Sequence, residues 1–108
     1  MNLLQETINS LKINNKLPTN VLWIGNNNVW FTWLEFSKIA DVEYDNGYGS
    51  PEVAIDLMVV GDGWWLEREE YDGSEWWSYK KLPQKPIQHK VPETLVGGMW
   101  RTLEDLNK

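Results

Sequence analysis

The sequence contains no cysteine among its 108 residues. Disulfides, thiolate zinc sites and cysteine nucleophiles are therefore excluded, and this composition is typical of a protein that stays in a reducing compartment. No apolar run approaches the roughly 20 residues that a membrane-spanning helix needs, so we expect no membrane partner. Residues 1–16 lack a basic start followed by an apolar run, and we expect no signal peptide there.

Residues that carry common chemistries are also scarce. The one histidine, His89, lies in a polar stretch near two prolines, and the sequence has no Gly-x-Ser-x-Gly nucleophile elbow. The segment Gly61-Asp62-Gly63 is too short for a phosphate-binding loop. Carboxylate pairs for glycoside hydrolysis are available only among glutamates beside a predicted turn, where little cleft surrounds them. We therefore expect neither an enzyme nor a bound cofactor.

The charges are unevenly distributed along the chain. The segment from Asp41 to Glu75 contains eleven acids and one base, a charge of −10, whereas residues 1–40 carry +1 and residues 76–108 carry +3. Direct binding to nucleic acid is disfavoured, because phosphate contacts need a basic surface. A basic protein partner or a metal ion suits the acidic segment better.

The stretch from Val59 to Leu82 is predicted to form the centre of the fold. It carries four of the eight tryptophans as two adjacent pairs, Trp64-Trp65 and Trp76-Trp77, on either side of Asp72-Gly73. Asp-Gly between two aromatic runs of period two is a strong hairpin signal, because a tight turn needs positive φ at its centre. We expect a three-strand meander over 53–60, 64–71 and 75–82.

Two helices are predicted before this meander. Leu4, Ile8 and Leu11 form an apolar stripe at helical spacing, and Asn2 can cap a helix over 3–13. A capping box at Thr32-Trp33-Leu34-Glu35 opens a second helix, which should end near 41–43. The remaining predicted elements are a hairpin at 21–25 and 29–31, an ordered loop at 44–52, an extended, mobile segment at 83–98 and a short helix at 99–106.

Together these elements predict a single α+β domain over residues 1–108. We expect an antiparallel sheet of about five strands, with the capping-box helix packed on one face and short terminal helices flanking it.

A two-residue turn fixes the cross-strand partners of the hairpin, and adjacent strand residues point to opposite faces. Trp64 and Trp77 are therefore expected on one face, with Trp65 and Trp76 on the other. Either loop and tail cover this second face and complete a two-sided core, or it is an exposed aromatic platform rimmed by acids, as in a binding hot spot. The candidate binding residues are Trp65, Glu67, Glu69, Glu70, Asp72, Glu75 and Trp76.

The same register gives two further expectations about the hairpin. Arg68 lies opposite Trp77, where an internal cation–π contact is expected. Glu70 and Glu75 lie directly opposite each other, which raises one of the two pKa values if the carboxylates are close.

The acidic segment also contains a partial calcium-loop pattern. Asp41, Glu43, Asp45 and Glu52 fall at positions 1, 3, 5 and 12 of an EF-hand-like frame. The match is imperfect, because Asn46 stands where glycine is needed and a strand is predicted after the loop instead of a helix. The competing interpretation is a solvated turn whose polar side chains bond their own backbone.

Several segments resemble a known protein family. They are IADVEYDNGYGSPE at 39–52, DLMVVG at 56–61, WWLER at 64–68 and EYDGSEWW at 70–77. The chain resembles small uncharacterised proteins carried by temperate phages and prophages of Gram-positive bacteria, over about half its length. The resemblance implies a phage-encoded accessory protein in a bacterial cytoplasm, with no activity to transfer to any residue.

The expected function is binding of a host or phage protein through an acidic, Trp/Tyr-rich sheet surface. The alternative is a nucleic-acid mimic, in which the acidic face occupies the DNA site of a host or defence protein. Salt sensitivity separates the two, because mimicry depends on charge and an aromatic hot spot does not. The sequence does not indicate an oligomeric state.

Overall fold

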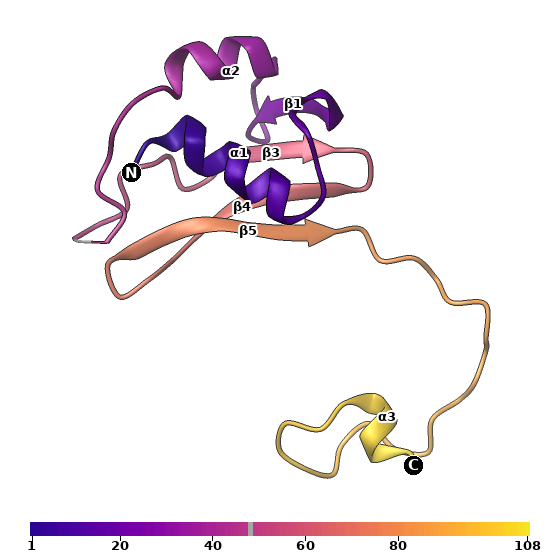
Figure 1. The fold of residues 1–108 in the computed structure, drawn as a ribbon. Helices are drawn as coiled ribbons and strands as arrows, with labels where there is room; N and C mark the ends of the chain where they lie inside the picture. The colour runs from indigo at the N-terminus through magenta and orange to yellow at the C-terminus, as the bar shows by residue number, and fades with distance from the viewer. Residues whose placement is uncertain (48) are drawn as a thin grey trace.

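The computed structural model describes residues 1–47 and 49–108, so that Tyr48 of the predicted loop at 44–52 lies outside the described residues. The α+β class is confirmed (Figure 1). The elements are, in chain order, α1 (Leu3–Ile13), the 3₁₀ helix η1 (Pro18–Asn20), β1 (Val21–Gly25), β2 (Trp30–Phe31), α2 (Trp33–Ile39), β3 (Met58–Gly61), β4 (Trp64–Tyr71), β5 (Ser74–Lys81) and α3 (Leu103–Leu106).

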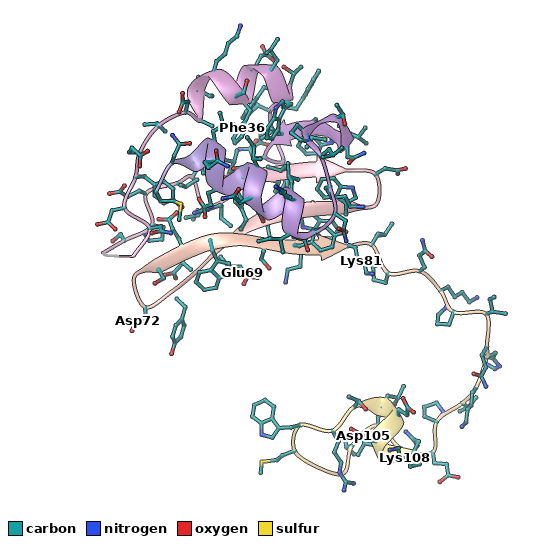
Figure 2. The ribbon with its side chains drawn as sticks, in the orientation of Figure 1. Phe36, Glu69, Asp72, Lys81, Asp105 and Lys108 are labelled. Carbon is teal, nitrogen blue, oxygen red and sulfur yellow. The ribbon has the colours of Figure 1, made fainter. Side chains whose placement is uncertain are left out.

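The five strands form one antiparallel sheet in the order β2-β1-β3-β4-β5. The β4–β5 turn is the predicted one, since Asp72 and Gly73 have φ values of 50° and 85°. The register is also the predicted one, with Arg68 opposite Trp77 and Glu70 opposite Glu75. The hairpin tip, marked by Asp72 in Figure 2, extends beyond the helices.

The hydrophobic core lies on one face of the sheet, beneath α1 and α2. Ile24, Val59 and Leu66 are register partners on three neighbouring strands, and all three are fully buried. Leu11 of α1 and Phe36 of α2 pack against this row. Figure 2 shows Phe36 between α2 and the sheet.

Both predicted helix starts are confirmed. The Asn2 side chain accepts a hydrogen bond from the backbone N–H of Gln5, and Thr32 and Glu35 form the reciprocal capping box. α2 is shorter than predicted and ends at Ile39. The chain turns there because the carbonyl of Ala40 accepts a hydrogen bond from Leu4 of α1.

The predicted strand at 53–60 is only half right, since β3 begins at Met58. Alternating apolar residues suggested an extended strand, but Leu57 N–H donates to the Ala54 carbonyl across a turn. Val53 is buried and Ile55 is 75% exposed, so the two do not share a face. The N–H of Val53 donates to a buried carboxylate instead of to a neighbouring strand.

Beyond Lys81 the chain leaves the sheet. Figure 1 shows an extended segment running away from β5 to the short helix α3, which lies apart from the other elements. The predicted helix at 99–106 is thus reduced to Leu103–Leu106, capped by Thr102, and it does not flank the sheet. Among the described residues, no helix is long and apolar enough to cross a membrane.

Candidate binding face

Strand register places four tryptophans on the sheet face opposite the core. Ile24 and Phe31 are partners on the core side, so their neighbours Trp23 and Trp30 point the other way. Trp65 and Trp76 lie on this same face by the alternation in β4 and β5. We call it the open face, and its residues are Trp23, Trp30, Met58, Val60, Trp65, Glu67, Glu69, Trp76, Ser78 and Lys80.

No described element forms a second layer over the open face. Both long helices pack on the core side, and the C-terminal segment runs away from the sheet (Figure 1). Trp30 is 69% exposed and Trp76 is 38% exposed, and Trp23 and Trp65 are half-buried, whereas Trp64 and Trp77 on the core side are 4% and 7% exposed. Of the two interpretations of the second face, the structure therefore supports the exposed aromatic platform.

A shallow hollow lies at the β1–β2 hairpin. It has a volume of about 420 Å³ and is lined by Leu22, Trp23, Asn26, Asn27, Asn28, Val29 and Trp30. Leu22 reaches it because the β1–β3 register shifts between Val21 and Trp23. This bulge places a leucine beside the indoles, and the hollow is mostly apolar.

The charges of the open face are carried by β4 and β5. The Lys80 ammonium lies 3.3 Å from the Glu69 carboxylate, and both side chains are partly exposed. Glu67 is half-buried, and Glu70 and Asp72 are exposed at the hairpin tip. The aromatic band is thus rimmed by carboxylates at one end only.

Glu75 lies inside the molecule, in contrast to the other predicted binding residues. Its side chain is 4% exposed, and one oxygen accepts a hydrogen bond from Arg68 Nη2 at 2.8 Å. The N–H groups of Glu52 and Val53 donate to its two oxygens, at 2.7 and 3.3 Å. Because three donors hold the carboxylate in the interior, Glu75 is unable to contact a partner and leaves the candidate set.

Arg68 is the centre of this buried cluster. Its side chain is 3% exposed and its guanidinium lies 4.7 Å from the Trp77 ring centre, so the predicted internal cation–π contact is confirmed. Nη1 lies 3.4 Å from both oxygens of Glu6, and Nη2 donates to the Tyr44 hydroxyl at 3.0 Å. Its Nε has no hydrogen-bond partner among the described residues.

Burial and hydrogen bonding act together on the pKa values of Glu75 and Tyr44. Burial acts to raise the pKa of Glu75, but the Glu52 N–H and the Arg68 guanidinium outweigh it and the pKa is lowered. Burial and a hydrogen bond to Glu6 raise the pKa of Tyr44 to about 12.

The cluster joins three parts of the chain: α1 through Glu6, the loop through Tyr44, and the β4–β5 hairpin through Arg68 and Glu75. It supports the hairpin from the core side. The open face is therefore presented by a fixed strand pair and not by a free ribbon, since an isolated hairpin is only marginally stable in water.

The four calcium candidates do not converge. Asp41 accepts from the Asn2 side chain, and Glu43 pairs with the N-terminal ammonium. Asp45 accepts from the N–H of Gly47, and Glu52 accepts from the N–H of Asp45. The bonds of Asp45 and Glu52 to backbone N–H groups are those of the solvated-turn interpretation, whereas Asp41 and Glu43 contact the N-terminal segment. Within residues 1–47 and 49–108, no three acidic or histidine side chains are grouped to hold a metal ion.

The structure therefore brings together most, but not all, of the predicted site. Trp65, Glu67, Glu69 and Trp76 share the open face. Sequence reasoning missed Trp23 and Trp30, although the alternation of Trp23-Ile24 and Trp30-Phe31 carried the signal.

Comparison with known proteins gives no significant match to a family model, to a curated protein sequence or to a solved structure. The function is therefore inferred from the geometry of the sheet.

Proposed function

We propose that this chain is a non-catalytic binding module that receives another protein on the open face of its sheet. The observation that carries the proposal is the set of four tryptophans on a face that no other described element covers. Large apolar patches on a folded surface mark interaction sites, and tryptophan dominates the centres of protein interfaces. The carboxylates at the hairpin tip form a polar rim and favour a partner with basic residues near its contact surface.

The resemblance to phage and prophage proteins supplies the setting of this proposal. The module is then a phage-encoded accessory protein in the bacterial cytoplasm, acting on a host or phage protein. This setting rests on the resemblance alone and is independent of the binding face.

Nucleic-acid mimicry has less support from the arrangement of charge. A mimic needs carboxylates in rows at phosphate-like spacing, but Glu75 is buried and Glu69 is paired with Lys80. The open face presents indoles between few charges. We therefore favour an aromatic interface over a phosphate-like one.

The test is to isolate a partner from lysate of a Gram-positive host and titrate it, once purified, by calorimetry. We expect Trp76→Ala to weaken binding about tenfold or more, because truncating a central interface tryptophan costs about 2 kcal/mol or more. Leu34→Ala is the matched control, since Leu34 is 64% exposed on α2, in the layer opposite the open face.

Salt distinguishes the two functions. Binding by the aromatic face should persist in high salt, because exposed charge pairs are screened and apolar contacts are not. Binding that is unchanged by Trp76→Ala, or that high salt abolishes together with Glu67→Gln, would reject the aromatic interface. The second result would support mimicry.

A further inference from the structure

The C-terminal segment begins with a stiff linker. Residues 83–92 contain three prolines, Pro83, Pro86 and Pro92, and no helix or strand. Proline-rich linkers are extended and semi-rigid, and ten residues span at most roughly 33 Å. Figure 1 shows this linker carrying the C-terminus away from its own sheet.

A closed loop follows the linker. The Asn107 side chain accepts hydrogen bonds from the N–H groups of Glu93 and Thr94, and donates to the carbonyls of Thr94 and Leu103. The three bonds to Glu93 and Thr94 tie the two ends of residues 93–107, which we call the C-terminal loop. The loop is thus a defined shape, with Asp105 on its short helix in Figure 2.

The C-terminal loop presents apolar side chains to solvent at its tip. Trp100 is 97% exposed, and its φ of 63° is a conformation that bulky residues rarely adopt. Strained residues of this kind are concentrated at contact and switch sites. Six apolar residues of linker and loop are each more than 70% exposed: Ile87, Val91, Leu95, Val96, Met99 and Trp100.

The linker and the hairpin tip have complementary charge. The linker carries Lys85 and Lys90 and no acidic residue. The open face carries Glu67, Glu69 and Lys80, and Glu70 and Asp72 are exposed at the hairpin tip. The C-terminal loop itself carries Glu93, Glu104, Asp105 and Arg101. The charge match is therefore between the basic linker and the acidic hairpin tip, and the loop contributes its apolar side chains.

We propose that the C-terminal loop of one copy seats Met99 and Trp100 on the open face of a second copy, and that the second copy returns the same contact. This inference rests on the proposed function, since it names an occupant of the same face. A second copy is favoured over the chain's own face because the proline linker directs the loop outward. A reciprocal exchange also gives a closed twofold dimer, in which both complementary surfaces are used.

The contact has a consequence for other partners. A protein that binds the open face must displace the C-terminal loop, so partner binding and self-association exclude each other. In the dimer the open face is therefore covered by the C-terminal loop, and it becomes accessible when a partner that binds more tightly displaces the loop.

The experiment is sedimentation equilibrium of the full chain from micromolar to millimolar concentration. We expect a monomer–dimer equilibrium that Trp100→Ala and Trp30→Ala each weaken about tenfold or more. Leu34→Ala, an exposed apolar truncation on the opposite layer, should leave it unchanged. Mixing the two tryptophan variants should restore a weaker heterodimer, because one intact loop then meets one intact face.

Three results would overturn the proposal. One is a monomer over the whole concentration range. If Trp100 in that monomer is also shielded from acrylamide, the C-terminal loop lies on the open face of the same chain. Another is a dimer that both tryptophan variants leave intact. The third is a mixture that fails to associate. Because partner binding is measured separately, a monomer that still binds a partner through Trp76 would reject the dimer and leave the proposed function standing.

Discussion

Trp76 and Trp77 are neighbours on β5, yet they belong to different parts of the molecule. Trp77 is 7% exposed, donates a hydrogen bond to Thr7 of α1 and lies against the Arg68 guanidinium. Trp76 is 38% exposed and has no helix above it. The two faces of the hairpin thus have different roles. One face packs in the core and stabilises the fold, and the other is available for contact with a partner.

The glutamates of the hairpin show the same division. Glu75 is held by three donors on the core side, whereas Glu69 on the open face is paired only with a partly exposed lysine. Composition alone therefore says little about the role of a tryptophan or glutamate here. The face on which the residue lies decides it.

The largest expected effect comes from truncating the inner tryptophan. Trp77→Ala should lower the free energy of unfolding by about 3–5 kcal/mol, because it leaves a cavity and removes the hydrogen bond that the indole donates to Thr7. Trp76→Ala should lower it by about 1 kcal/mol or less, as for a partly exposed side chain. Urea denaturation of both variants measures the difference, and equal losses would remove the distinction between the faces.

Breaking the buried charge cluster should have the next largest effect. Arg68→Met should destabilise the protein by about 3 kcal/mol, because it leaves Glu6 and Glu75 without their cation. Arg101→Met, at an exposed position, is the control and should change stability by less than about 0.5 kcal/mol. A loss in Arg68→Met no larger than in this control would show that the cluster adds nothing to the fold.

The smallest of the three effects is a dependence of stability on acid. The pKa of Glu75 is lowered from its ordinary value of 4.5, so its contribution is present above that pH and is lost as the pH falls through the lower value. Glu75→Gln should flatten the fall in stability on the acid side. Urea titrations from neutral pH down to about pH 3 test this, with Glu70→Gln at the exposed tip as the control. Parallel curves for wild type and Glu75→Gln would contradict the lowered pKa.

The centre of the fold was predictable from sequence because its signals are local. Asp72-Gly73 fixed the turn, the turn fixed the register, and the register divided the tryptophans between the faces. The capping residues Asn2 and Thr32 likewise marked both helix starts. These features depend on residues a few positions apart.

The errors arose where distant residues compete for the backbone. The pattern at 53–57 alternates like a strand, but the N–H of Val53 donates to a carboxylate 22 residues away. Glu75 was predicted as a binding residue beside the turn, although it has the same strand parity as Trp77, which puts it on the core side beside Arg68. The alternation of residues along β5 indicated this position. The residues that bond Glu75 are distant in the chain, and the sequence pattern did not identify them.

The hydrogen bond between Thr7 and Trp77 has a consequence for the order of events during synthesis. It joins residues 70 positions apart, and Glu6 and Arg68 are 62 apart. An isolated helix of eleven residues is marginal in water. Before β4 and β5 have been made, α1 has its backbone hydrogen bonds to residues 40–42 but lacks its buried contacts with the hairpin. The first helix of this chain is therefore among the last parts to become fixed. It packs in its final position only after nearly three quarters of the sequence has been synthesised.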